Sequence, residues 1–401
     1  MGKKVLVIGT LDTKKDEFLY VKDILESNNQ TVLLMNTGIY DTSIPGDITS
    51  SEVAEAGGVS LQELRDKNDR GTAVATMTKG AASIVSTLLE ENEISGIFGM
   101  GGTAGTTVAA TAMRNAPVGL PKILVSTVAS GNTRPYVGDK DITMMYSVVD
   151  IAGINGLSAE ILKNAANALS GMVQGAEKGP KVESKPMIAA TMFGVTTPCV
   201  TKTRELLEDQ GYDVLVFHAT GTGGDAMESL IQDGFIEGVV DITTTEFADR
   251  LVGGIFSAGD DRLESAGKIG IPQVVSVGAL DMVNFGPPET VPEQFKDRLF
   301  YQHNPTTTLM RTTVEENKQL GKLIAEKLNK AESKTVVILP KGGVSLLDKE
   351  GQAFEGNEQR EVLYASIKEN LNENIPYIEV EEDINDPSVS ELIVKELLQF
   401  M

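Results

Sequence analysis

FGMGGTAGTT, residues 98–107, follows the apolar run Ile94–Phe98 and leads into a segment of helical pattern that extends to Arg114. Successive glycines let a chain turn tightly from a strand into a helix, and they let the backbone approach a bound group closely. Amides at a helix N-terminus point at such a group and favour an anion. This glycine loop, residues 98–107, therefore predicts a strand–turn–helix unit of an α/β fold and a phosphate site. The alternative is a turn in which glycine serves packing alone.

The glycine loop differs from the two common nucleotide motifs. The G-x-x-x-x-G-K-[ST] spacing and its lysine are missing. Gly99-x-Gly101-x-x-Ala104 satisfies a loose dinucleotide fingerprint. However, the loop follows the third expected strand, and no acidic residue stands about 20 residues onward, as that fingerprint requires. The glycine loop therefore indicates a site for a phosphate group and argues against NAD as the ligand.

Outward from this loop, the first half of the chain alternates apolar β-branched runs with amphipathic segments. Alternation of this kind predicts right-handed crossovers and a parallel sheet covered by helices on both faces. The expected strands are Val5–Ile8, Thr31–Met35, Ile94–Phe98 and Lys122–Ser126, and the expected helices include Lys14–Ser27 and Ala73–Leu89.

The second half of the chain repeats this pattern. Residues 4–38 and 186–221 align as strand, loop, helix, turn and strand with nearly the same spacing. We therefore expect an α/β fold of two Rossmann-like lobes with mostly parallel sheets, internally duplicated. The expected domains are residues 1–178 and 186–401, because charge, Gly and Pro interrupt the pattern between them. Whether the end of the chain crosses back to the first lobe is left open.

The composition excludes several classes of function. The formal net charge is −22, so the protein would repel a nucleic acid. The sequence contains no cluster of basic residues interleaved with aromatic ones that could offset this repulsion. A small anion can still be held by local amides and one or two cations. The single cysteine, Cys199, excludes an intrachain disulfide and fits a reducing compartment. No signal-peptide pattern and no apolar stretch near the roughly 20 residues that span a bilayer are found, so we expect a cytoplasmic protein without a membrane segment.

The loop after the first expected strand carries Asp12, Thr13 and Lys14. A role as helix N-cap would by itself explain Asp12 and Thr13. Lys14 opposes the helix dipole unless an anion lies beside it, which favours a ligand there. Arg70 precedes another expected helix and could offer a fork of donors to a phosphate, or it could pair with Asp66 or Asp69 on the surface.

The second half carries a further set of candidates. The loop His218–Ala226 is rich in glycine and leads into a helix, so it is either a second anion site or a structural turn. His303 and Arg311, with Lys341, suggest acid–base chemistry on a carboxylate or carbonyl in a cleft between the lobes. No C-x-x-C or H-E-x-x-H spacing is present, so no protein-bound metal is expected. A Mg²⁺ carried in by a nucleotide remains compatible with the sequence.

Several motifs in series resemble the UPF0261 family, the Tm-1-like ATP-binding proteins. They are VIGTLDTKKDE, DRGTAVATM, GMGGTAGTT, KILVSTVASGNT and VVDIAGIN in the first half, and FGVTTPCV, HATGTGGDAME, DITTTEFAD, HNPTTTLMRTT and LPKGGVSLLD in the second. The resemblance implies two Rossmann-like subdomains, with ATP bound by the first. By position, the ATP contacts it implies are Asp12, Thr13, Lys14, Thr37, Arg70, Gly101, Gly102, Thr103 and Ala104. Some relatives carry a TIM-barrel domain; this chain has none, so such a partner would be a separate protein.

Two functions from different classes follow from these observations. The first is a nucleotide-binding protein, a homodimer or higher homo-oligomer, that binds ATP with or without Mg²⁺ for regulation or assembly. The alternative is an enzyme of small-molecule metabolism that uses His303, Arg311 and Lys341. A third interpretation is a structural or interaction protein. In that case the glycine loops would be packing turns that bind no ligand. The glycine loop contains no obvious general base, which weighs against fast ATP hydrolysis.

Overall fold

The chain forms two compact units in the computed structural model, residues 1–182 and 183–401, which we call lobe 1 and lobe 2 and describe separately. The structure describes residues 2–176, 178 and 185–401. No helix in these ranges is both long enough and apolar enough to cross a bilayer.

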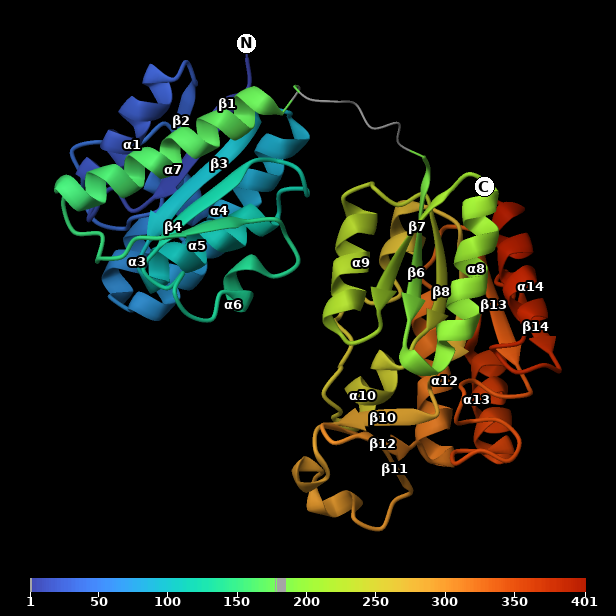
Figure 1. Cartoon of the computed structure of the whole chain (residues 1–401). Coiled ribbons are helices and arrows are strands. Elements are labelled where there is room, and N and C mark those ends of the chain that lie inside the picture. The colour runs from blue at the N-terminus through green and yellow to red at the C-terminus, as the bar shows by residue number, and fades with distance from the viewer. Residues whose placement is uncertain (1, 177, 179–184) are drawn as a thin grey trace. The chain divides into compact units, whose positions relative to one another are not determined.

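Lobe 1 is a five-stranded parallel sheet in the order β2-β1-β3-β4-β5 (Figure 1). Its strands are β1 (Lys4–Gly9), β2 (Val32–Asn36), β3 (Ile94–Gly101), β4 (Lys122–Ser126) and β5 (Thr143–Tyr146). Its helices are α1 (Lys15–Ser27), α2 (Ser50–Ala56), α3 (Leu61–Lys67), α4 (Arg70–Glu90), α5 (Thr103–Arg114), α6 (Arg134–Val137) and α7 (Gly156–Gly175).

Helices cover both faces of this sheet because its strands are apolar on both faces. Along β1, Val5 and Val7 pack with α1 and α7, whereas Leu6 and Ile8 pack with α2, α4 and α5. This alternation is the strand period of two. Figure 1 shows α1 and α7 on one side of the sheet and α4 and α5 on the other. The predicted parallel sheet with two covered faces is therefore confirmed.

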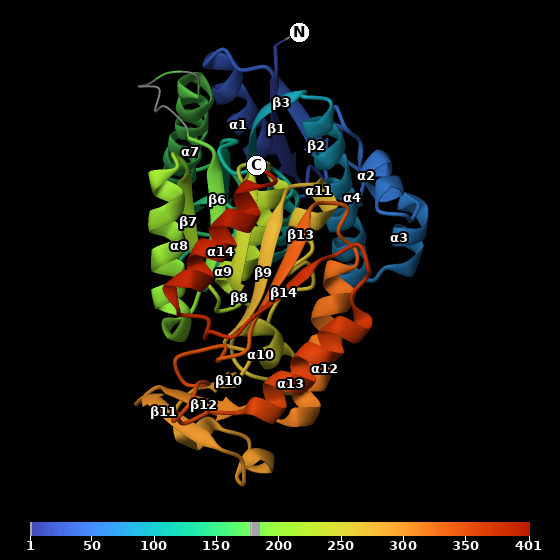
Figure 2. The same cartoon turned by 90° about the vertical axis from the view of Figure 1, so that its right-hand side faces the viewer.

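Lobe 2 is built around a six-stranded parallel sheet in the order β14-β13-β9-β8-β6-β7 (Figure 2). Its strands are β6 (Met187–Met192), β7 (Asp213–His218), β8 (Gly238–Thr243), β9 (Gln273–Gly278), β13 (Thr335–Pro340) and β14 (Tyr377–Val380). Its helices are α8 (Thr197–Asp209), α9 (Thr222–Gln232), α10 (Glu246–Val252), α11 (Ser265–Ile269), α12 (Val314–Leu328), α13 (Asn357–Asn370) and α14 (Pro387–Leu398), with 3₁₀ turns at η1 (Gly194–Thr196), η2 (Pro288–Thr290) and η3 (Glu293–Phe295).

The two sheets share one topology. Read from β7, the order β7-β6-β8-β9-β13 matches β2-β1-β3-β4-β5 of lobe 1, strand for strand in chain order, and β14 is an addition. The predicted internal duplication is thus confirmed. The sequence left open whether the end of the chain crosses back to the first lobe. The last helix, α14, packs with α8 on the sheet of lobe 2 through Ile393 and Leu397 (Figure 2).

A small antiparallel sheet in lobe 2 was not predicted from the sequence. It has the order β10-β12-β11 and consists of β10 (Met282–Phe285), β11 (Phe300–Asn304) and β12 (Thr307–Arg311). Most of β11 is exposed, so this strand lacks the apolar run that identifies the buried strands. The edge strands β5 and β14, of four residues each, were not predicted either.

Two helical glycines of lobe 1 provide a matched test of this packing. A Cβ on Gly80 of α4 would overlap the carbonyl oxygen of Val53 in α2, whereas a Cβ on Gly171 of α7 would meet no atom of the described residues within 4 Å. We expect Gly80→Ala to lower the free energy of unfolding by about 1–3 kcal/mol, because the two helices must separate. Gly171→Ala should raise it by up to about 1 kcal/mol through lost backbone entropy of the unfolded chain. Urea unfolding of both variants followed by circular dichroism tests this, and equal effects would contradict it.

Candidate functional site

A cavity of about 550 Å³ lies at the carboxyl ends of β1, β2 and β3 in lobe 1. In the sheet order, β1 has β2 on one side and β3 on the other, so the strand order reverses at this point. Open α/β sheets bind their ligands at such a switch point. All the nucleotide contacts implied by the family resemblance line this one cavity: Asp12, Thr13, Lys14, Thr37, Arg70, Gly101, Gly102, Thr103 and Ala104.

The glycine loop forms the cavity wall between β3 and α5. Strand β3 continues to Gly101, and α5 begins at Thr103. The N-cap residue is Gly102, which has no side chain to accept a hydrogen bond from the first amides of the helix. A Cβ on Gly101 would lie 2.8 Å from the Cα atom of Gly105, and a Cβ on Gly105 would lie 3.2 Å from the carbonyl oxygen of Met100. A Cβ on Gly102 would meet only the hydroxyl of Thr127, at 3.8 Å. Packing therefore explains Gly101 and Gly105 but not Gly102, which stands on the cavity wall at the start of a helix.

The loop after β1 does not serve as a helix cap through Asp12 or Thr13. The N-cap of α1 is Lys14, and it makes no side-chain cap hydrogen bond. Asp12 instead accepts a hydrogen bond from the amide of Tyr40 at 3.1 Å, and the ammonium of Lys14 donates to the carbonyl oxygen of Ile151. The N-cap alternative for Asp12 and Thr13 is wrong, and both residues lie on the cavity wall instead.

Arg70 is the first residue of α4 and lines the same cavity. Its expected surface partners are engaged elsewhere, since Asp69 caps α4 through the amide of Thr72 and Asp66 accepts from Gln62. Within the described ranges no ion pair involves Arg70. Its side chain is exposed, so the guanidinium is available to a ligand in the cavity.

The charge of the cavity is mixed. Lys14 and Arg70 are its cations, whereas Asp12, Asp69 and Asp150 bring carboxylates to its wall. A phosphate would therefore depend on the helix amides of the glycine loop as well as on these two cations.

Part of the cavity wall was not predicted from the sequence. The additional residues are Thr10, Gly38, Ile39, Tyr40, Asn68, Asp69, Ala73, Val74, Met77, Val108 and Asp150. The stretch after β2 was foreseeable, because the ligand loops of a parallel sheet follow its strands. The apolar residues of α4 and α5 were not, since their helical spacing is the same as that of ordinary core residues.

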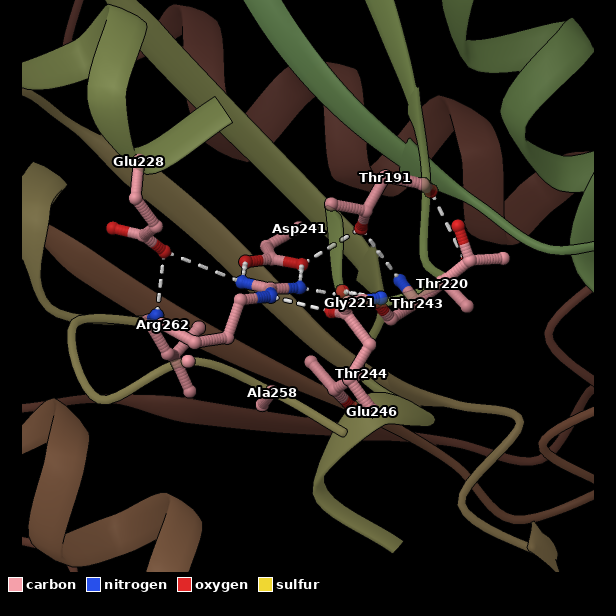
Figure 3. Close-up of polar contacts among 12 residues, drawn as sticks. Thr191, Thr220, Gly221, Glu228, Asp241, Thr243, Thr244, Glu246, Ala258 and Arg262 are labelled. Carbon is pink, nitrogen blue, oxygen red and sulfur yellow. Dashed lines mark hydrogen bonds and ion pairs between the residues drawn. The ribbon is translucent and has the colours of Figure 1, made fainter. Parts of the chain in front are cut away.

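Lobe 2 fills the equivalent position with a buried side chain (Figure 3). There β6 and β8 correspond to β1 and β3, and the fully buried guanidinium of Arg262 lies at the end of β8. Arg262 donates to both carboxylate oxygens of Asp241, to Glu246 and, at 3.2 Å, to the carbonyl oxygen of Thr243. Glu228 of α9 lies 3.5 Å from the same guanidinium and also accepts two backbone amides, from Leu263 and Ser265.

This cluster holds three carboxylates around one guanidinium, all buried (Figure 3). Burial raises the pKa of Glu228 and that of Glu246, and the positive charge of Arg262 acts in the opposite direction on both. Glu246 also accepts the amide of Gly221 at 3.0 Å. The glycine turn after β7, within His218–Ala226, therefore already has an anion from its own chain.

None of the cavities found among the described residues is lined by all three catalytic candidates of lobe 2. Arg311 is buried and pairs with Asp348 at 3.1 Å, and Lys341 pairs with Glu381. His303 is exposed and lines a separate cavity of about 400 Å³, together with Tyr301, Lys349 and other residues. Neither Arg311 nor Lys341 lines that cavity. No group of three or more His, Cys, Asp or Glu suited to a metal ion is found in the described parts of the chain.

Fold and cavity together define a duplicated, doubly wound α/β protein with a ligand-sized cavity at the switch point of its first lobe. Models for the N-terminal and C-terminal domains of uncharacterised protein family UPF0261 match residues 3–178 and 185–401. The chain belongs to the UPF0261 family, as the motifs predicted.

Relatives of known name agree with this assignment. A UPF0261 protein of Clostridium tetani is 52% identical over the full length of both chains. A UPF0261 protein of Mesorhizobium japonicum is 43% identical over 98% of each. The ToMV resistance protein Tm-1(GCR237) of Solanum lycopersicum is 41% identical over 99% of this chain and 55% of its own length. A solved structure, a putative UDP-N-acetylglucosamine 2-epimerase from Listeria monocytogenes, matches 69% of this chain and 79% of its own at 11% identity and a TM-score of 0.23, from which no functional inference follows.

The cluster around Arg262 leads to a prediction about stability. Arg262→Met leaves Glu228, Asp241 and Glu246 buried without their cation, so we expect the free energy of unfolding to fall by about 3–5 kcal/mol at pH 8. Loss of the guanidinium raises the pKa of Glu228 and that of Glu246 further, so the folded variant binds protons that the unfolded chain does not. The deficit should therefore shrink as the pH falls from 8 to 5.

Urea unfolding at both pH values measures this effect. Arg204→Met is the matched control, because Arg204 forms an exposed ion pair with Glu208 on α8 and its loss should cost about 1 kcal/mol or less. An Arg262→Met variant as stable as the wild type at pH 8 would show that the cluster does not hold lobe 2 together.

Proposed function

We propose that lobe 1 binds ATP in the cavity at the ends of β1, β2 and β3, with the phosphates on the amides that begin α5. The observation that carries this proposal is Gly102. It stands at a helix N-terminus on the cavity wall, and no described residue packs so closely against it that glycine is required. Amides at a helix start, free of a side-chain cap, are suited to a phosphate.

Lys14 and Arg70 complete the phosphate end of the site in this proposal. They come from the starts of two different helices, α1 and α4, so each sits where a helix dipole favours an anion. Lys14 would exchange its hydrogen bond to the carbonyl of Ile151 for a charge-assisted one to a phosphate oxygen. Arg70 can offer two parallel donors.

A Mg²⁺ that arrives with the nucleotide fits the remaining wall. Mg²⁺ usually takes one or two carboxylates from a protein and the rest of its ligands from phosphates and water. Asp12 and Asp150 both line the cavity, and among the described residues the buried Oδ1 atom of Asp12 has no hydrogen-bond partner. These two carboxylates would hold the ion and offset its charge.

The site favours binding over turnover. The glycine loop offers no general base, so we propose that ATP serves regulation or assembly of a cytoplasmic homo-oligomer. The alternative, an enzyme using His303, Arg311 and Lys341, gains no support from their placement, because Arg311 and Lys341 are held in ion pairs away from the cavity of His303.

Two variants test the nucleotide site by calorimetric titration with ATP. Lys14→Ala should weaken ATP binding roughly 10- to 100-fold, because a hydrogen bond to a charged group is lost. Gly102→Val should weaken it at least as much, because its side chain projects where the phosphates approach. The fold has room for a Cβ there, so the melting temperature of the ligand-free Gly102→Val protein should stay near that of the wild type.

Lys15→Ala is the matched control. Lys15 is the next lysine in the chain, and its side chain faces Asp16 and Ser43 outside the cavity. ATP affinity should not change in this variant. Unchanged ATP affinity in both Lys14→Ala and Gly102→Val, or no ATP binding by the wild type, would overturn the proposal.

A further inference from the structure

One aromatic ring on the cavity wall is unusually exposed. Tyr40 is 57% exposed, more than any other large apolar side chain in the described parts of lobe 1 or lobe 2. It lies in the stretch that follows β2, at the opposite end of the cavity from the glycine loop in sheet order. An exposed ring on a ligand cavity offers a flat face for stacking.

The backbone around Tyr40 is held from several sides. The amide of Tyr40 donates to Asp12 at 3.1 Å, and the carbonyl oxygen of Ile39 accepts from Arg65. Arg65 also pairs with Asp41 at 3.0 Å. The Gly38 amide donates to the buried Asn36 at 2.9 Å. A segment fixed in this way presents its ring without a large entropy cost on binding.

The sequence at Gly38 supports this arrangement. A Cβ on Gly38 would overlap the carboxylate of Asp12. Glycine at this position therefore lets Asp12 approach the segment and reach the amide of Tyr40. The loop after β1 and the segment after β2 thus form one unit, and both line the cavity.

The sheet sets the distance between the two ends of the cavity. Strand β1 separates β2 from β3, so the ends of β2 and β3 lie about 10 Å apart, two strand spacings. A ribose bridges a separation of this size between a base and its phosphates. The wall near α4 is apolar, with Val74 and Met77 on the cavity.

We infer that Tyr40 stacks on the nucleobase of the bound nucleotide, with the base at the end of β2 and the phosphates at the end of β3. The inference rests on the proposed nucleotide site and adds the direction in which the ligand lies. It also names the ligand class: the site takes a phosphate ester that carries an aromatic base, and a bare polyphosphate fills only half of it.

Parallel titrations with ATP and inorganic tripolyphosphate in one magnesium-containing buffer separate the two ends of the site. Tyr40→Ala should weaken ATP binding about 5- to 150-fold, the loss of one base–aromatic stack, and leave the tripolyphosphate affinity unchanged. Tyr40→Phe keeps the ring and should restore ATP binding. Tyr146→Ala, at another exposed tyrosine of lobe 1 that does not line the cavity, should change neither affinity.

The outcomes distinguish the inference from the proposed function. ATP affinity that is unchanged in Tyr40→Ala would overturn the stacking of the base, while the nucleotide site would stand. Equal losses for ATP and tripolyphosphate would do the same, because Tyr40 would then act on the phosphates or on the fold of the segment. Failure of the wild type to bind either compound would overturn both proposals.

Discussion

In both lobes the chain leaves the first strand of the sheet toward one neighbour and returns on the other side for the third strand. Two helices therefore diverge from the carboxyl ends of adjacent strands, and their first amides lack partners within the helix. The crevice between them can hold an acceptor for these amides, either a bound anion or a side chain of the same lobe. Which group fills it decides what each lobe can do.

The duplicated lobes differ in the residues that line this crevice. Lobe 1 has glycine at the critical turn and surrounds it with Lys14 and Arg70, so its crevice is a cavity that suits an anion. Lobe 2 has Thr243 and Glu246 in the corresponding stretch, and Glu246 supplies an internal carboxylate to the amide of Gly221. Arg262 then neutralises part of the buried negative charge (Figure 3). One topology thus yields an open cavity, the proposed nucleotide site, in one lobe and a structural ion cluster in the other.

The sequence predicted the elements whose signal is local. Apolar runs followed by glycine identified β1, β3 and β6, and the family motifs identified nine residues that line one cavity. Local signal fails where long-range contacts decide. Arg262 lies in an ordinary polar stretch, and only the fold brings it to Asp241. Strand β11 is largely exposed and carries no apolar run, so His303 could not be assigned to its own cavity beforehand.

The same limit applies to the pairing of charged side chains. The residue types of His303, Arg311 and Lys341 suggested catalysis, yet Asp348 and Glu381, which pair with Arg311 and Lys341, come from later segments of the chain. For Lys14 the reverse holds. A lysine at a helix start conflicts with the helix dipole, and this local conflict predicted a residue that the structure does place on the cavity wall.

Photolabelling with an azido-ATP that carries its reactive group on the base, followed by peptide mapping, tests the central claim most directly. If only the crevice of lobe 1 accepts a nucleotide, label that excess ATP prevents should map to the peptides around residues 37–40 and 70–77. Label of the same kind in the lobe 2 peptides around residues 218–228 or 243–249 would contradict the claim that Arg262 and Glu246 have closed the second crevice.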